Sequence, residues 1–320
     1  MENSLRGLSQ KISELFTRSG LDDPWVETRF FLREVAGLTL EEQLAQADHP
    51  LAEETVSELW SKAKRRAARE PLAYITGEAW FYGRRFFVKA GLLVPRADSE
   101  VLIEAALDEL RKLTSELPAR SDKKPLRILD TCCGTGCLGL TLLAELNDMD
   151  IPACLHLIDL DDLALQTAKE NADRLGLTEQ ISLEKADLWP ARTVMDSEVF
   201  VEPEIRIGLA GKPEVYGRYD VILSNPPYIL SADISGLMPE VAVWESKKAL
   251  DGGVDGLEFY RRLAEGWQDY LSESGIMILE LGAGQAEQVI SLFDPAEQVW
   301  IRLREDYNGL QRALILKGHT

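Results

Sequence analysis

Apolar positions in the first 70 residues recur at intervals of three and four, which is the spacing of an amphipathic helix. The pattern covers residues 8–20, 24–37 and 51–70. Glycine closes the first two segments and Pro71 follows the third, as expected where helices end. These features predict a small helical domain over residues 1–78.

The pattern changes over residues 79–96, where aromatic and aliphatic residues flank Tyr82-Gly83 and Ala90-Gly91. Short apolar runs with glycine between them are typical of paired strands. We therefore expect a β-hairpin linker over residues 79–96. A helical pattern follows from residue 96 to residue 113.

From residue 126 onward, short strand-like runs alternate with helical segments. This alternation predicts an α/β fold with a doubly wound, mostly parallel sheet over residues 97–320. The expected strands lie at 126–130, 154–159, 181–188, 219–224, 275–282, 299–305 and 310–317. The expected helices lie at 138–146, 161–176, from about 257, and at 286–293. Residues 190–217 lack clear periodicity, and we interpret them as an insertion over one edge of the ligand crevice.

Composition is ordinary for a globular protein, with 320 residues, 45% of them hydrophobic. No apolar run reaches the ~18 residues of a membrane span, and the first residues do not resemble a secretory signal. The four cysteines lie close together, three of them around one glycine-rich turn, and lack paired zinc-site spacing. We therefore expect a reduced, cytoplasmic protein without a metal site. We also expect no membrane association and a monomer.

The formal net charge of −19 argues against direct nucleic-acid binding, which is expected to need a basic surface. One basic cluster departs from this trend, and it comprises Lys62, Lys64, Arg65, Arg66 and Arg69. Two interpretations stay open at this point. The cluster is either the solvated face of a helix or a contact with an acidic partner or RNA.

A glycine-rich turn joins the first predicted strand of the sheet to its helix. Gly134, Gly136 and Gly139 match the spacing GxGxxG, and Asp159 lies 20 residues beyond the last glycine. This arrangement is found in dinucleotide-binding domains, so a nicotinamide or flavin cofactor is one alternative. The glycine spacing alone is weak support for it.

Three aspartates favour a different ligand. Asp130 ends the strand before the turn, where a carboxylate suits a cationic group better than a pyrophosphate. Asp159, at the end of the next strand, can accept both ribose hydroxyls, and Asp187 can accept a hydrogen bond from an adenine amino group. Together they describe an adenosine with a positive tail, which S-adenosylmethionine (AdoMet) provides.

The fourth predicted strand ends in Asn225-Pro226-Pro227-Tyr228. Proline cannot continue a sheet ladder, so these residues predict a stiff turn at the end of a buried strand. The Asn225 side-chain oxygen and the Pro226 carbonyl can accept the two N–H groups of a planar NH₂, and Tyr228 can stack on its plane. Such a grip would aim the nitrogen at a methyl donor.

This motif resembles that of the amino-methyltransferases, and the surrounding segments narrow the resemblance. They are similar, in order, to the peptide chain release factor glutamine methyltransferases (the HemK/PrmC family). The matching segments are 69–100, 129–140, 158–177, 219–229, 249–263, 279–289 and 304–316. The resemblance implies a Rossmann-like class I AdoMet-dependent methyltransferase whose helical domain recognises the substrate. It also implies N5-methylation of the glutamine in the Gly-Gly-Gln loop of class 1 release factors.

By position in the motifs, the resemblance also implies the site. The catalytic segment would be Asn225 to Tyr228, and the AdoMet site would include Asp130, Cys132, Cys133, Gly134, Thr135, Gly136, Asp159, Asp187, Leu188 and Asn225. Cys132 replaces the first glycine of the family motif, Ser246 stands where the family favours proline, and the 190–217 insertion is long. The motifs also leave open a ribosomal protein glutamine, a nucleic-acid base amino group, or a non-catalytic binding module.

Overall fold

The computed structural model describes residues 4–116, 125–190, 218–294 and 299–317. The chain divides into two compact units. One comprises Met1–Ala79 with Gly236–Glu245, and the other comprises Trp80–Ser235 with Ser246–Thr320. The segment 236–245 thus belongs with the helical unit, although its sequence lies inside the α/β region. Among the described residues, no helix has both the length and the apolar character needed to span a bilayer.

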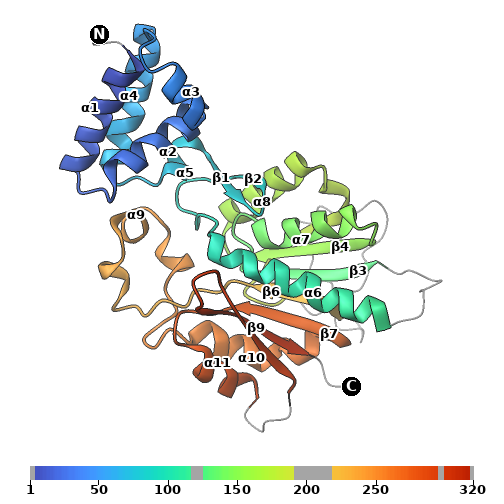
Figure 1. Cartoon of the computed structure of the whole chain (residues 1–320). Coiled ribbons are helices and arrows are strands. Elements are labelled where there is room, and N and C mark those ends of the chain that lie inside the picture. The colour runs from blue at the N-terminus through green and yellow to red at the C-terminus, as the bar shows by residue number, and fades with distance from the viewer. Residues whose placement is uncertain (1–3, 117–124, 191–217, 295–298, 318–320) are drawn as a thin grey trace. The chain divides into compact units, whose positions relative to one another are not determined.

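The helical unit contains helices over all three segments predicted for it (Figure 1). Its core joins α1, α2 and α4 around the Phe16 and Phe31 rings, which meet edge to face at 5.7 Å. Three short helices, α3, α5 and α9, were not expected, because each spans fewer than two turns and carries no periodic pattern. The helices are α1 (Leu5–Arg18), α2 (Pro24–Ala36), α3 (Leu40–Ala45), α4 (Glu53–Ala67), α5 (Leu72–Thr76) and α9 (Pro239–Ala242).

The basic cluster of α4 is largely neutralised within the helical unit. Arg66 pairs with Glu27 at 2.6 Å and with Glu240 of α9 at 2.8 Å, and Arg69 also reaches Glu240 at 2.8 Å. The Arg66 side chain is only 9% exposed. Ion pairing that joins α4 to α2 and to segment 236–245 therefore accounts for these arginines without an external partner.

The second unit is built on a seven-stranded sheet in the order β5-β4-β3-β6-β7-β9-β8 (Figure 1). The first five strands in this order are parallel, and β9 runs antiparallel to both of its neighbours. The expected strands and the doubly wound, mostly parallel fold are confirmed. The bounds are β3 (Leu126–Thr131), β4 (Ala153–Asp159), β5 (Ile181–Lys185), β6 (Tyr219–Ser224), β7 (Leu271–Glu280), β8 (Ile301–Glu305) and β9 (Gln311–Lys317).

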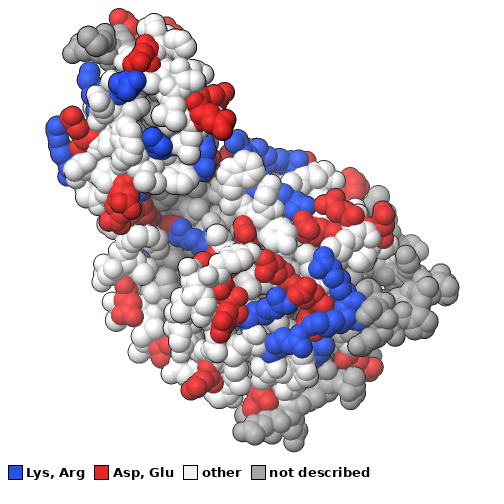
Figure 2. All heavy atoms as spheres, viewed as in Figure 1, with Lys and Arg blue, Asp and Glu red and all other residues white. Residues whose placement is uncertain are grey.

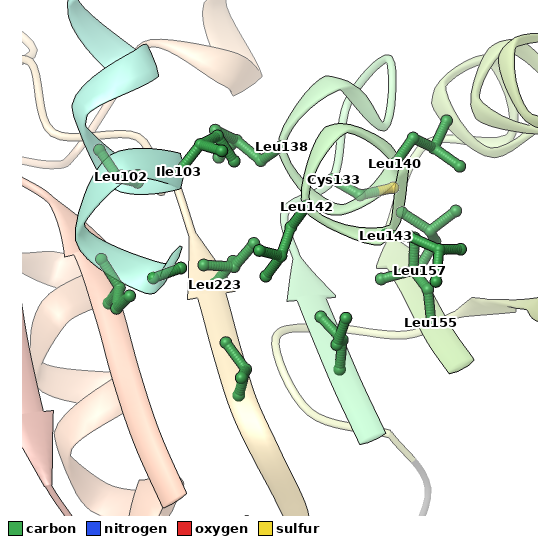
Figure 3. Packing of buried hydrophobic residues seen from close by; sticks show 14 of the residues in the cluster. Leu102, Ile103, Cys133, Leu138, Leu140, Leu142, Leu143, Leu155, Leu157 and Leu223 are labelled. Carbon is green, nitrogen blue, oxygen red and sulfur yellow. The ribbon is translucent and has the colours of Figure 1, made fainter. Parts of the chain in front are cut away.

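Helices cover both faces of this sheet. Alternate strand residues such as Leu155 and Leu223 face one layer of helices, and Figure 3 shows Leu155 close to Leu143 and Leu223 close to Leu142, both of α7. The intervening residues face α10 and α11 in a second buried cluster. This period of two is what buries both faces of parallel strands. The helices are α6 (Glu100–Glu116), α7 (Cys137–Asp148), α8 (Asp162–Leu175), α10 (Glu258–Tyr270) and α11 (Ala286–Phe293).

The linker contains one strand pair rather than two. β1 (Glu78–Phe81) and β2 (Arg84–Phe87) form the hairpin around Tyr82-Gly83, but residues 88–95 form no strand. The expectation of a second pair around Ala90-Gly91 was therefore wrong. Gly91 has φ +93°, a conformation outside the strand region, and the segment lines a cavity instead.

We expect Arg66→Ala to lower the free energy of unfolding of the protein by about 3 kcal/mol, because it removes a buried cation that pairs with the partly exposed carboxylates of Glu27 and Glu240. Lys62→Ala is the matched control, since Lys62 makes a more exposed pair with Glu58 and its loss should cost under about 1 kcal/mol. Urea denaturation followed by circular dichroism measures both. Equal losses in the two variants would contradict the structural role given to Arg66.

Candidate active site

A cavity of about 1020 Å³ lies in the second unit, at the carboxyl ends of the parallel strands. It is large enough for a nucleotide-sized ligand. Most of the residues predicted from the sequence line it, namely Cys132, Cys133, Gly134, Thr135, Asp159, Asp187, Leu188, Asn225 and Pro227. Four predicted residues do not line it, namely Asp130, Gly136, Pro226 and Tyr228. Residues 191–217 of the proposed insertion lie outside the described residues.

The glycine turn is closely packed against its surroundings. Gly136 has φ +76°, and a Cβ there would lie 3.1 Å from Ala168 Cβ of α8. A Cβ on Gly139 would lie 2.8 Å from Leu155 and 2.9 Å from Asp130. Glycine is therefore needed at these positions so that α7 can approach the sheet and the neighbouring helix.

Asp130 is fully buried beneath this turn. Its Oδ2 accepts a 2.8 Å hydrogen bond from the Gly139 backbone N–H, and its Oδ1 is buried without a hydrogen-bond partner among the described residues. Burial raises the pKa of Asp130 to about 7. Asp130 is thus placed to hold the turn, and its orphaned oxygen is the kind of group that a nearby cation would stabilise.

Asp159 connects the turn to β4. Its two oxygens accept hydrogen bonds of 2.9 Å from the backbone N–H groups of Gly134 and Asp161. Burial raises its pKa, while these hydrogen bonds act in the opposite direction. Each carboxylate oxygen retains a lone pair, so Asp159 can still accept bonds from a ligand in the cavity.

Asp187 is differently placed, because its carboxylate forms a 2.7 Å ion pair with Arg262 of α10. Next to it, Leu188 is buried and has φ +68°, and its carbonyl accepts a 2.5 Å hydrogen bond from the Thr131 hydroxyl. Cys132, the residue at the first glycine position of the family motif, also has a positive φ of +59°. Both cavity residues adopt a backbone conformation that costs about 1–3 kcal/mol in a residue with a side chain.

The cysteines around the turn are not activated thiols. Burial raises the pKa of Cys132, Cys133 and Cys137 above the ordinary thiol value, and the nearby Asp130 acts in the same direction. The thiolate is the reactive form of cysteine, so these side chains stay protonated and inert near neutral pH. A covalent cysteine mechanism is therefore disfavoured at this site.

The Asn-Pro-Pro-Tyr turn begins directly after β6. The Asn225 amide donates to the Ser99 hydroxyl at 3.4 Å, and the Tyr228 hydroxyl donates to the Glu280 carboxylate at 3.2 Å. Gly252 allows its loop to pack closely against this turn, because a Cβ on Gly252 would lie 2.7 Å from the Tyr228 backbone. The turn is therefore held rigidly at both ends and along its backbone.

Three residues around this turn were not identified from the sequence. Ser99 and Glu280 contact its side chains, and Gln285 donates a 3.1 Å hydrogen bond to the Tyr228 carbonyl. All three residues lie within segments 69–100 and 279–289, which resemble the family. That resemblance could have identified them, but no role was assigned to these segments from the sequence. Their proximity to Asn225 depends on pairing between strands far apart in the sequence.

Comparisons with known proteins agree with this geometry. A family model described as the PrmC N-terminal domain matches residues 8–77. A release factor glutamine methyltransferase of Cereibacter sphaeroides is 34% identical over 92% of this chain and 91% of its own length. Another with the same name, from Geobacter sulfurreducens, is 32% identical over 92% of this chain and 90% of its own length. The chain belongs to the release factor glutamine methyltransferase family.

Solved structures add the fold. The human METTL16 catalytic domain bound to an RNA hairpin superposes with a TM-score of 0.50 at 14% identity, over 84% of this chain and 83% of that one. A release-factor-specific protein-(glutamine-N5) methyltransferase of Alicyclobacillus acidocaldarius matches 73% of this chain at 22% identity and a TM-score of 0.37. The sheet order described above and membership of the family give this protein the Rossmann-like fold of class I methyltransferases, and the likeness to the METTL16 domain agrees with that fold.

We expect Asp130→Asn to change the pH dependence of stability of the ligand-free protein. The folded-state pKa of Asp130, about 7, exceeds its ordinary value of 3.8. Between pH 3.8 and about 7, Asp130 is therefore protonated in the folded protein but ionised in the unfolded chain. Because the folded state binds the extra proton, the free energy of unfolding falls as the pH rises through this window. The variant should lack this loss and gain stability relative to wild type with increasing pH.

Thermal unfolding midpoints across the window measure this difference. Asp48→Asn is the control, because Asp48 is exposed and Arg6 lowers its pKa, which cannot produce the same trend. Parallel curves for wild type and Asp130→Asn would refute the shifted pKa.

Proposed function

We propose that this protein transfers a methyl group from AdoMet to the side-chain nitrogen (N5) of the glutamine in the Gly-Gly-Gln loop of class 1 peptide chain release factors. The observation that carries the proposal is the Asn-Pro-Pro-Tyr turn, whose Asn225 opens on the same cavity as the glycine turn. Membership of the release factor glutamine methyltransferase family supports the protein substrate. The cytoplasmic location and the monomeric state stay predictions.

The residues around the glycine turn fit AdoMet. The buried and unpartnered Oδ1 of Asp130 suits an ammonium group, although Asp130 does not line the cavity and would act through its field or a water. Asp159 has free lone pairs for the ribose hydroxyls. One carboxylate oxygen of Asp187 pairs with Arg262, so Asp187 would accept a hydrogen bond from the adenine amino group with its other oxygen. Backbone atoms from Cys132 to Thr135 and at Leu188 complete the proposed site, and Gly136, which does not line the cavity, contributes through the conformation of the turn.

When bound, AdoMet supplies an electrophilic methyl group on a sulfonium. An amide nitrogen is a weak nucleophile because its lone pair is delocalised, so its position has to be controlled. In the proposed mechanism, Asn225 Oδ1 accepts one N–H of the substrate amide from the cavity lining. The Pro226 carbonyl accepts the other N–H and Tyr228 covers the amide plane, although neither residue lines the cavity, so both contacts require the substrate to enter beyond the present lining. The prolines restrict the backbone, so these acceptors are already in place. Transfer leaves one N–H proton to be released from the nitrogen.

The alternatives differ in their substrate. A ribosomal protein glutamine would use the same residues, and only a substrate comparison separates it. A nucleic-acid amino group is disfavoured by the net charge of −19, and on the face shown in Figure 2 basic side chains lie among acidic ones. A nicotinamide enzyme has only the glycine spacing in its support.

Labelled methyl transfer tests the substrate. We expect label from AdoMet to appear on a purified class 1 release factor and not on the same factor with its loop glutamine replaced. DNA, RNA and ribosomal proteins should stay unlabelled in parallel reactions. Label that survives glutamine replacement, or that appears only on another substrate, would overturn the proposal.

We expect Asn225→Ala to reduce kcat by at least ~10²-fold, which is the scale for loss of one positioned polar group. AdoMet binding, measured by calorimetry, should change little, because the proposed cofactor site rests mainly on the glycine turn. Asn147→Ala is the matched control, since Asn147 bonds to Gln180 away from the cavity and its loss should leave kcat unchanged. Near-normal turnover of Asn225→Ala would contradict the assigned role.

A further inference from the structure

Both ends of the Asn-Pro-Pro-Tyr turn lead to one buried carboxylate, Glu280, at the end of β7. Glu280 is 1% exposed, and its Oε1 accepts the hydrogen bond from Tyr228 at 3.2 Å. Its backbone carbonyl accepts a 2.7 Å hydrogen bond from Tyr260 of α10, which holds the end of the strand in place. Glu280 does not line the cavity, so it can act on a substrate only through other residues.

Ser99 connects the same carboxylate to the other end of the turn. Its hydroxyl is buried, accepts from the Asn225 amide at 3.4 Å, and is a hydrogen-bond neighbour of Glu280. The second oxygen of Glu280, Oε2, is buried and has no hydrogen-bond partner among the described residues. The Ser99 hydroxyl lowers the pKa of Glu280, so we infer that Ser99 supplies the donor that Oε2 lacks.

The chemistry of these groups determines the direction of the chain of hydrogen bonds. An ionised carboxylate only accepts, so the single Ser99 proton points to Glu280. The Ser99 oxygen can then only accept from Asn225, which must present its NH₂ group to Ser99. The Asn225 oxygen consequently faces the cavity, where the proposed mechanism needs an acceptor.

We propose that Glu280 and Ser99 are positioning residues for methyl transfer, which set the orientation of the Asn225 amide and hold the Tyr228 ring. The proposal rests on the proposed function, because it assigns a task to the acceptor that grips the substrate amide. The two flipped orientations of an asparagine amide have nearly the same shape, so packing alone does not select one of them. Without the carboxylate, the flipped orientation would present the NH₂ group, a donor, to the substrate N–H.

Burial and the neighbours of Glu280 act on its ionisation in opposite directions. Arg312 lies nearby and is itself held by a 2.9 Å hydrogen bond to the Leu281 carbonyl and a 3.2 Å contact with Asp306. Burial raises the pKa of Glu280, whereas the Ser99 and Tyr228 hydroxyls and the Arg312 charge act in the opposite direction. Glu280 thus combines low exposure with two hydroxyl groups and a guanidinium that stabilise its ionised form.

Glu280→Gln tests the direction of the chain of hydrogen bonds, because glutamine has nearly the same side-chain size as glutamate but carries one donor group. Its amide oxygen would keep the bond from Tyr228, which turns its NH₂ toward Ser99. Ser99 would then donate to Asn225 and turn the Asn225 oxygen away from the cavity. We expect kcat for the release factor to fall at least ~10-fold, with AdoMet affinity and the unfolding temperature close to those of the matched control below.

Ser99→Ala tests the link and provides a second variant if Glu280→Gln folds poorly. It should lower kcat in the wild-type background, and it should cause little further loss in Glu280→Gln or Asn225→Ala protein. Such non-additivity is expected only if Ser99 acts through Asn225. A purely structural role would instead give losses that multiply in the double variants.

Two controls match the chemical changes outside the site. Glu109→Gln neutralises a carboxylate that is also 1% exposed but pairs with Lys112 of α6 and Arg302 of β8. Thr167→Val removes a buried hydroxyl whose one hydrogen bond within the described part of the chain is to the Leu163 carbonyl of its own helix. Both should change stability without changing kcat.

The outcomes separate this proposal from the proposed function. If wild-type protein does not methylate the release factor, the function fails. If wild type is active and both Glu280→Gln and Ser99→Ala keep kcat within ~2-fold, the positioning proposal alone fails. It also fails if the two variants lose only AdoMet affinity or stability, or lose no more kcat than Glu109→Gln and Thr167→Val.

Discussion

The parallel pairing of β3 with both β4 and β6 is the constraint on which the site depends. Thr131 at the end of β3 is level with Ile158 of β4 and with Ser224 of β6. The residues that follow these strands therefore emerge at the same edge of the sheet. A one-residue change of register would turn the strand side chains to the opposite face, so burial of both faces keeps this alignment in place.

Buried acids support the loops at this edge. Asp130 lies beneath the glycine turn and Glu280 lies beneath the Asn-Pro-Pro-Tyr turn, and neither lines the cavity. Each accepts hydrogen bonds from one loop, and each has its pKa raised by burial. The protein thus keeps carboxylates in costly positions at the two places where loops must be held still.

Most of the fold could be predicted from the sequence, because it follows from local periodicity. Alternation of short apolar runs with helical segments identified the strands from β3 to β9, and the three longest helices of the first unit were also recognised. The short helices α3 and α5 and the single hairpin were harder, because their patterns are too short to be periodic. Gly91 illustrates this, since a glycine permits a turn but does not say whether strands flank it.

The sequence by itself determined which chemical groups are present and in what order they follow the strands. Asn225, the prolines and the glycine turn were identifiable because their local conformations have strict steric requirements. Only the tertiary structure decided which groups touch the cavity and which act from behind it. In the structure, Asp130 does not line the cavity and Asp187 forms an ion pair with Arg262. Ser99 lies next to Asn225, and Glu280 lies next to Tyr228. These contacts join residues more than 50 positions apart, so no local pattern encodes them.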